Sequence, residues 1–316
     1  MGIASYFVGE YSSLMKKFSV IENRTINRWV LNLPGAGCSH WKQHGGCAMC
    51  GFHVATRRYN KGFLLPGVIF KLLYVMAERF YKESKPSELL VYNGGSFWND
   101  KEIPRNFQHW FFQNVSSHDS MGKVLIENRC EYITLRKIHQ AVELLGNKKL
   151  YVGIGLESAD DFLRNVIIRK GLSRKFFEEK VKLLNNNGAF AMAYVFLKPM
   201  GLSDRLALKD VLATIDYALS MGVSEIDVSC AFVQRKTEME RQYLSGAFSP
   251  PRLEVIIELI DDIITHNWPV NIAGFDDYPP PIAIPRNCDK CSGAYYDAIE
   301  MFRQKKILGD IPTCDC

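Results

Sequence analysis

Three cysteines stand close together early in the chain, at Cys38, Cys47 and Cys50, in the spacing C-x8-C-x2-C. Three thiolates from one glycine-rich loop can hold three irons of a [4Fe–4S] cluster and leave the fourth iron open to a ligand. The same cysteines could instead bind zinc with one histidine. The candidate histidines are His40, His44 and His53. The spacing alone leaves both groups open, but it predicts a metal centre rather than incidental thiols.

A second cysteine group lies in the last 30 residues of the sequence. Cys288-x2-Cys291 and Cys314-x-Cys316 are two close pairs separated by 22 residues. Two such pairs can form a tetrahedral four-cysteine site with no open position, which suits a structural zinc. Four thiolates can equally hold a second [4Fe–4S] cluster. The segment between the pairs, 294–306, predicts an amphipathic helix.

Short β-rich runs alternate with amphipathic segments through most of the chain, which predicts an α/β fold with a parallel sheet, closed or partly closed into a barrel. The expected strands are 29–33, 88–92, 123–127, 150–156, 191–197, 225–230 and 270–272. The expected helices are 66–81, 133–145, 174–187, 204–220 and 251–266. We therefore divide the chain into an N-terminal extension (1–27), a barrel (28–266) and a cysteine-rich tail (267–316).

Unusual residues follow the ends of the expected strands, where parallel barrels carry their chemistry. The first strand leads into the first cysteine group. The next three lead into Asn93-Gly94-Gly95-Ser96, Glu127-Asn128-Arg129 and Gly155-Leu156-Glu157-Ser158. These loops are expected to meet at one mouth.

Composition excludes several classes of protein. The 316 residues are 47% hydrophobic and 23% charged, as in a globular protein with a full core, which excludes a disordered chain. No apolar run is long enough to span a membrane and no signal peptide is visible, so we expect a cytoplasmic location and no membrane partner. The net charge of +5 permits a nucleic-acid partner without requiring one.

These motifs together resemble the radical S-adenosylmethionine (SAM) superfamily. Within it, the sequence is similar to the branch of the Elongator catalytic subunit and, more closely, to the radical SAM subunit of archaeosine synthase. The segments that carry the resemblance are 46–52, 95–97, 126–129, 155–158, 169–171, 233–237 and 250–251. The resemblance covers about residues 28–316. One departure is Cys130, which follows Arg129 where the family commonly has proline.

The resemblance implies a partial (β/α)6 barrel in which Cys38, Cys47 and Cys50 hold a [4Fe–4S] cluster and SAM binds its open iron. One electron would cleave SAM to methionine and a 5′-deoxyadenosyl radical that abstracts a substrate hydrogen. The residues expected to contact SAM are Phe52, Gly94, Gly95, Ser96, Glu127, Arg129, Glu157, Ser158 and Lys170.

Several of these residues have expected roles toward SAM. The glycines would let backbone approach it closely, and Ser96 would accept from its ammonium. Phe52 would lie beside the adenine and Glu157 would hold the ribose hydroxyls. Arg129 or Lys170 would pair with the carboxylate of SAM.

For the substrate, the resemblance implies a lysine-modified 7-deazaguanine in tRNA, with hydrogen abstraction followed by C–N cleavage. The implied partners are a one-electron donor such as ferredoxin or flavodoxin, and a subunit that supplies RNA-binding surface. Two alternatives remain: the same radical chemistry on a small metabolite or peptide, and a non-enzymatic zinc protein that binds nucleic acid. The residues expected around a substrate pocket are Asn93, Tyr194, Lys198, Gln234 and Arg235. The aromatic candidates for stacking on a base are Trp98, Trp110, Phe111 and Phe112.

Overall fold

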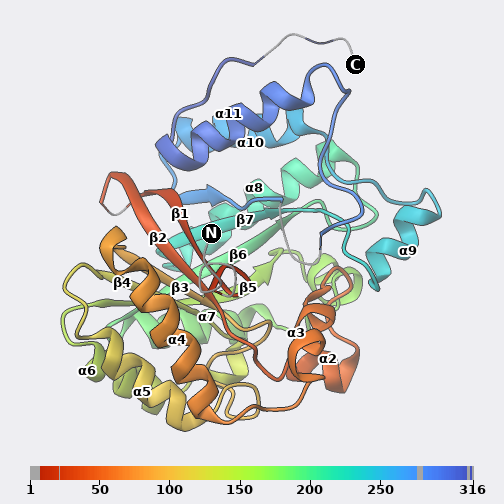
Figure 1. Cartoon of the computed structure of the whole chain (residues 1–316). Coiled ribbons are helices and arrows are strands. Elements are labelled where there is room, and N and C mark those ends of the chain that lie inside the picture. The colour runs from red at the N-terminus through yellow and green to blue at the C-terminus, as the bar shows by residue number, and fades with distance from the viewer. Residues whose placement is uncertain (1–7, 21, 276–279, 312–313, 315–316) are drawn as a thin grey trace.

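The computed structural model describes residues 8–20, 22–275, 280–311 and 314. Its centre is an eight-stranded sheet whose strands follow one another in chain order and curl into a half-barrel (Figure 1). The strands are β1 (Ser12–Ser19), β2 (Arg24–Asn32), β3 (Glu88–Tyr92), β4 (Lys123–Glu127), β5 (Lys149–Glu157), β6 (Ala189–Leu197), β7 (Glu225–Cys230) and β8 (Val270–Ile272). β1 pairs antiparallel to β2, and all later pairs are parallel. The predicted α/β partial barrel is confirmed.

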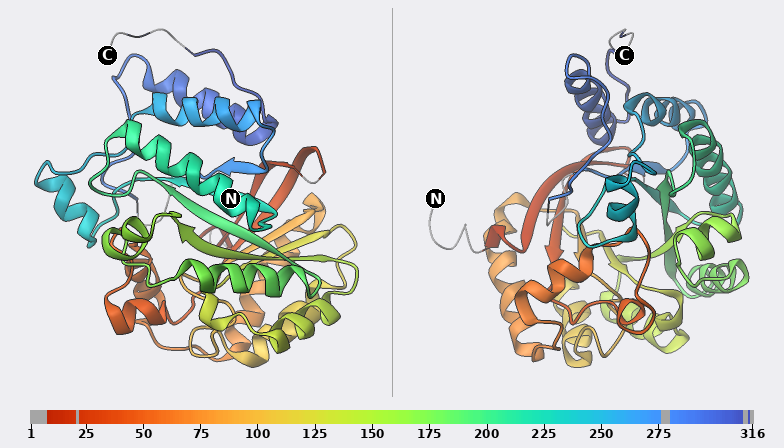
Figure 2. Two further views of the ribbon diagram at one scale, coloured as in Figure 1. Left: turned by 180° about the vertical axis from the view of Figure 1, so that it is seen from behind. Right: turned by 90° about the vertical axis from the view of Figure 1, so that its right-hand side faces the viewer.

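The helices between the parallel strands cover the outer face of the sheet, and others lie at its ends and over its open side (Figure 2). They are α2 (Ser39–His44), α3 (Phe52–Asn60), α4 (Gly67–Tyr81), α5 (Arg105–Val115), α6 (Leu135–Leu145), α7 (Arg174–Asn185), α8 (Asp204–Ser220), α9 (Glu238–Leu244), α10 (Leu253–Thr265) and α11 (Ser292–Lys305). Three single turns complete the list: η1 (Lys82–Ser84), η2 (Cys130–Tyr132) and η3 (Leu163–Ile167), the last a π-turn. Connections through helices bring the carboxyl ends of β2–β8 to one end of the sheet.

The parallel strands are apolar on both faces, because one face meets the helices and the other meets the barrel lumen. In β3, Leu89 and Val91 belong to the large core beneath the helices. Leu90, between them, belongs to a separate cluster in the lumen with Tyr151 and Met192. This double burial explains why β3, β4, β7 and β8 have the bounds that the sequence predicts.

The hairpin of β1 and β2 differs from the prediction. β2 begins at Arg24 rather than Trp29, and β1 lies within the segment expected as an N-terminal extension. β1 reads SSLMKKFS, and its few apolar residues give a weak pattern. Its pairing depends on β2 and on a turn in which Asn23 has φ +49°. The proposed three-part division of the chain stays a prediction.

α5 was not expected, and it corrects the expectation for the aromatic residues. Trp98, Phe111 and Phe112 are at most 3% exposed and pack in the main core. They cannot stack on a base. Aromatic runs have modest helix propensity, so tertiary packing decides this helix.

The amino-terminal half of the lumen is filled by buried charges. The Lys17 ammonium lies 2.7 Å from the Glu225 carboxylate, and Arg28 lies 2.6 Å from Glu88. Lys123 bridges both carboxylates, 3.5 Å from Glu88 and in contact with Glu225. Each cation has an anion beside it, as buried charges require. This layer closes one end of the half-barrel and leaves the carboxyl end for the site.

The last helix covers the open side of the half-barrel. α11 packs against α10 and contacts both edge strands, β1 and β8. The Thr25 hydroxyl donates to the Gln304 carbonyl over 2.7 Å, and Lys306 donates to the Val270 carbonyl. In the part of the chain described, no helix is long and apolar enough to cross a bilayer.

Candidate active site at the carboxyl end of the half-barrel

The first cysteine group lies in the loop after β2 that contains α2. Gly45, at φ +79°, ends α2 and turns the chain back, so that Cys47 and Cys50 come into electrostatic range of Cys38. Burial raises the pKa of the Cys47 and Cys50 thiols, and the neighbouring cysteines raise it further. The structure therefore brings the three predicted ligands together.

A carboxylate that the sequence analysis missed holds this loop in place. Glu102 is fully buried and accepts hydrogen bonds from the backbone N–H of Ser39 at 2.8 Å and of Ser96 at 2.5 Å. It also accepts from the Asn99 amide at 2.7 Å. Glu102 thus links the cysteine loop to the loop after β3. A glutamate six positions after the serine of a Gly-Gly-Ser turn is the signal that could have identified it.

The glycines after β3 permit a close approach of backbone segments. Gly94 has φ +63°, and a Cβ atom there would lie 2.6 Å from Thr56 Cγ2. A Cβ on Gly95 would collide with the Glu102 carboxylate and lie 3.2 Å from Cys38 Cα. The Ser96 hydroxyl accepts from the Arg129 backbone N–H at 3.1 Å, which joins the loops after β3 and β4. These contacts hold the loops of the site together independently of any bound ligand.

Charged groups from β4 and β5 converge beside Cys47. A register shift at the end of β5 and the positive φ of Glu157, +67°, aim its carboxylate at Lys170 Nζ, 2.6 Å away. Burial alone would lower the pKa of Lys170, but Glu157 and Cys47 together more than offset this, and the net shift is upward. Both Lys170 and Arg129 act electrostatically on the Cys47 thiol.

Arg129 and Ser158 are engaged by protein groups. The Arg129 guanidinium donates to the Lys170 carbonyl at 3.0 Å and to Glu131 at 2.8 Å. The Ser158 hydroxyl donates to Asp210 of α8 at 2.7 Å. Burial raises the pKa of Asp210 to about 6. The Ser158 hydroxyl therefore links the end of β5 to α8.

The upper lumen holds acidic and phenolic groups. Burial raises the pKa of Glu127 to about 8, although Tyr194 and Lys170 oppose the shift. Asp227 of β7 and Tyr92 of β3 lie in the same electrostatic neighbourhood. Glu127 is therefore mostly protonated at neutral pH and can donate a hydrogen bond into the lumen.

Comparisons with known proteins agree with this arrangement. No family model matches the chain. Archaeosine synthase subunit beta of Methanosarcina acetivorans is 26% identical over 89% of this chain and 80% of its own length. The protein of the same name from Thermococcus kodakarensis is 24% identical over 72% and 69%. The solved structure of Elp3 from Methanocaldococcus infernus superposes with a TM-score of 0.55 at 18% identity, over 78% of this chain and 67% of that one. The chain therefore shares the fold of that structure. Its suspected likeness to archaeosine synthase subunit beta is confirmed.

Residues of this site fit the cofactors that the sequence resemblance implies. Asn93, 1% exposed, has neither amide atom paired with any group that the structure describes. A buried amide requires partners, and a bound polar molecule would supply them. The sulfurs of the first cysteine group are spaced more widely than those of a single-ion site, since among the described residues they do not form a set within 4.8 Å. Wider spacing is expected where each thiolate binds a separate iron of a cluster.

Gln234 supports the same loop from the far side of the barrel. Its side-chain oxygen accepts from the Gly51 backbone N–H at 2.6 Å. A Cβ atom on residue 51 would lie 2.6 Å from that oxygen, so only glycine fits. The Ala48 N–H donates to the Ile168 carbonyl at 2.8 Å and ties the cysteines to the loop that carries Lys170. Gln234, expected near substrate, is thus placed against the cysteine loop.

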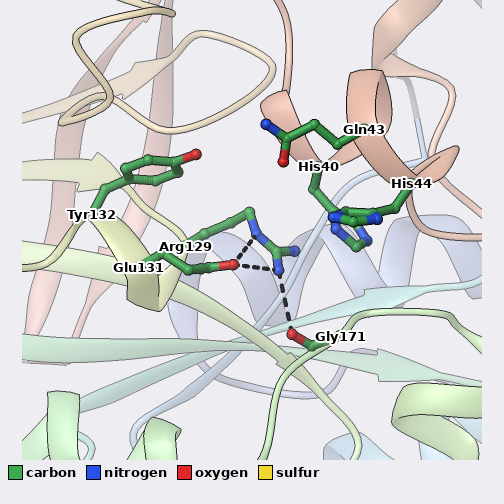
Figure 3. A pocket seen from close by; sticks show the side chains of 7 residues that line it. All are labelled: His40, Gln43, His44, Arg129, Glu131, Tyr132 and Gly171. Atoms are coloured by element: carbon green, nitrogen blue, oxygen red, sulfur yellow. Dashed lines mark hydrogen bonds and ion pairs between the residues drawn. The ribbon is translucent and has the colours of Figure 1, made fainter.

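A polar pocket of about 250 Å³ opens beside the first cysteine group (Figure 3). Its lining residues are His40, Gln43, His44, Arg129, Glu131, Tyr132 and Gly171. Figure 3 shows the Arg129–Glu131 pair between the two histidines and Tyr132. Burial lowers the pKa of His40, whose Nε2 lies 3.0 Å from the Arg169 carbonyl. The pocket borders the cysteine loop directly, because His40, Gln43 and His44 belong to α2 within that loop.

The terminal cysteines form a tighter group. Cys288 Sγ lies 3.4 Å from Cys291 Sγ and 3.6 Å from Cys314 Sγ, and all three sulfurs lie within 4.8 Å of one another. Sulfurs around one tetrahedral zinc, with bonds of about 2.3 Å, lie about 3.8 Å apart. Cys316, the predicted fourth ligand, lies outside the described residues. The tail folds back along α11, since a Cβ on Gly309 would lie 3.5 Å from Ala298 Cα.

Proposed function

We propose that this chain is a radical SAM enzyme and the catalytic subunit of an archaeosine-type tRNA modification. The observation that carries the proposal is the convergence of three cysteines, Lys170–Glu157 and Arg129 at the mouth of a radical SAM barrel. Similarity to archaeosine synthase subunit beta over 89% of the chain supports the choice of pathway.

The first cysteine group would hold the [4Fe–4S] cluster. Cys38, Cys47 and Cys50 supply three thiolates, which leave one iron free for SAM. When bound and reduced, the cluster and SAM together supply a carbon radical able to take hydrogen from an unactivated C–H bond. Glu102 and Gln234 keep the loop in position through the hydrogen bonds described above.

The charged residues beside Cys47 would bind SAM. Lys170 and Arg129 offer positive charge to its carboxylate. Glu157 and Glu127 can hold ribose hydroxyls, Glu157 as an acceptor and Glu127, in its protonated form, as a donor. Phe52, 43% exposed at the start of α3, would lie against the adenine face. The walls of this site would be formed by uncharged residues, which are Gly94, Gly95, Ser96 and Ser158.

The substrate would be a lysine-modified 7-deazaguanine in tRNA, cleaved at a C–N bond after hydrogen abstraction. A ferredoxin or flavodoxin would supply the electron, and the word subunit in the name of the relatives supports a partner chain. The terminal cysteines would hold zinc, since their sulfur spacing matches a single tetrahedral ion.

Anaerobic purification with metal counting tests the proposal directly. We expect about four irons, about four sulfides and one zinc per chain, a brown protein, and SAM cleavage after reduction. Cys47→Ala should lose the iron and the cleavage activity. Cys130→Ala is the matched control, because Cys130 is also buried near Arg129 and should keep both.

Two results would overturn the proposal in different ways. A colourless wild-type protein with zinc at both cysteine groups would exclude radical chemistry. A brown protein that cleaves SAM but leaves lysine-modified tRNA unchanged in the presence of the partner subunit would exclude the substrate and retain the enzyme class.

A further inference from the structure

The charge of this chain is unevenly distributed along the sequence. Residues 23–77 contain no aspartate or glutamate, although the whole chain has 34 acidic residues. The lysines and arginines of the same segment are Arg24, Arg28, Lys42, Arg57, Arg58, Lys61 and Lys71. The net charge of the chain is only +5, so the remainder of the chain is slightly acidic. Positive charge is therefore concentrated in the segment that carries the first cysteine group.

Part of this basic segment forms a surface beside the site. We use the name α2–α3 surface for residues 39–63, which comprise α2, α3 and the start of the loop to α4. α2 and α3 lie next to each other on the same side of the molecule as α9 in both Figure 1 and Figure 2. Lys42 and Lys61 are exposed there, and Lys42 Nζ donates to the Gly62 carbonyl at 3.1 Å.

Exposed aromatic rings accompany these lysines. Phe63 is 72% exposed and Phe52 is 43% exposed. Trp41 and His53 stack on each other with ring centroids 4.4 Å apart, which joins α2 to α3. A surface that combines lysines with exposed aromatic faces is typical of proteins that bind unpaired nucleotides, since the lysines contact phosphates and the rings stack on bases.

We infer that the α2–α3 surface docks RNA, with Lys42 and Lys61 on the phosphate backbone and Phe63 stacked on an unpaired base. The inference rests on the proposed function and adds the surface by which this chain itself contacts the nucleic acid. Its position beside the cysteine loop would bring the bound RNA to the mouth of the barrel. Charge complementarity favours RNA over a protein partner, since the surface has no acidic residue.

Fluorescence anisotropy with a labelled tRNA transcript, titrated with the full-length, iron-loaded chain at several salt concentrations, tests this inference. Lys42→Ala/Lys61→Ala should weaken binding about tenfold and reduce the salt slope by about 1 per lysine. Phe63→Ala should weaken binding about tenfold with the slope unchanged. Lys182→Ala/Lys209→Ala, two exposed lysines of α7 and α8, is the control and should bind as wild type.

Three results would overturn the inference: wild-type affinity in the lysine variant, equal weakening in the control, or no RNA binding by the wild-type chain. Val68→Ser/Leu72→Ser tests a protein partner at a different place, because these residues of α4, outside the α2–α3 surface, have exposed aliphatic side chains. If only this variant loses binding to a partner subunit and the lysine variant binds RNA normally, the partner docks on α4 and the inference for the α2–α3 surface is overturned. SAM cleavage is measured in the same samples, so loss of the docking inference is distinguished from loss of the proposed function.

Discussion

The two cysteine groups of this chain use the same side chain in opposite surroundings. Around Cys47, burial raises the thiol pKa and charged partners from β4 and β5 act on it. Around Cys288, hydrogen bonds from Cys291 and its neighbours lower the thiol pKa to about 6. The sulfurs of the terminal group lie within 4.8 Å, whereas those of the first group do not meet that limit.

The difference agrees with the proposed division into a reactive site and a structural one. The first group lies beside Lys170, Glu157 and Glu127, near the carboxyl ends of the strands. A molecule bound there is therefore close to both a basic side chain and acidic ones. The terminal group joins the start of α11 to the returning tail and has room for one ion. A site that must admit a ligand keeps an open position, and a site that fastens a chain does not.

The largest expected effect comes from removing a ligand of the first group. Cys38→Ala should abolish iron binding and lower SAM cleavage by more than about 1,000-fold, because no other group supplies the radical chemistry. Its thermal midpoint should stay close to that of the apo wild type. Iron analysis, product chromatography and calorimetry measure these quantities. A large loss of stability with retained iron would reverse the assignment of the two groups.

The second largest effect is expected when a ligand of the terminal group is removed, and it falls on stability rather than on SAM cleavage. Cys291→Ala should lose zinc and lower the thermal midpoint by about 10 °C, because binding energy at a structural site is folding energy. The iron content of the first group should remain. Cys230→Ala, a fully buried cysteine outside both groups, is the control and should cost about 1 kcal/mol. Retained stability together with iron loss in Cys291→Ala would make the tail a redox centre.

A smaller effect is expected for Glu102→Gln, which leaves the ligands intact. The amide has one acceptor oxygen where the carboxylate accepts from three donors, so we expect a loss of about 2 kcal/mol in stability and slower cluster assembly. Glu131→Gln is the matched control, since that side chain is 44% exposed and its pair with Arg129 contributes little. Denaturant unfolding of the two variants should separate a positioning carboxylate from a surface one.

The smallest effect concerns the pH dependence of stability. The pKa of Glu127 is about 8 in the folded chain against 4.5 for an ordinary glutamate. Between these values the folded chain binds the extra proton, so stability falls as pH rises from about 4.5 to about 8 and then levels. Glu127→Gln imitates the protonated form, so its stability relative to the wild type should increase across the same window. Unfolding of the apo proteins at pH 5, 6, 7 and 8 tests this, and a constant difference would contradict it.

The sequence predicted the parts of the fold that local patterns determine. β3, β4, β7, β8 and α8 have their predicted bounds, because each is a strongly periodic or unbroken apolar run. β1 and α5 were missed because their pairing and packing depend on partners elsewhere in the chain. The local sequence pattern gives no information on contacts with residues elsewhere in the chain.

The site was predictable in its types of residue and less so in its connections. The three cysteines, Glu157, Lys170 and Arg129 meet at one mouth. The pairing of Lys170 with Glu157 depends on a shift in strand register, and the role of Glu102 depends on two loops that meet only in the folded chain. Whether the predicted residues contact SAM stays a prediction.

The ion pair between Lys17 and Glu225 joins residues 208 positions apart, and Thr25 meets Gln304 across 279. The first strands to leave the ribosome therefore find their final neighbours only when almost the whole chain has been synthesised. During that interval the hairpin of β1 and β2 exposes the charged residues that later face the lumen. In this state chaperones can bind the chain, or chains can associate prematurely. Production of this protein should therefore benefit from slow translation at low temperature.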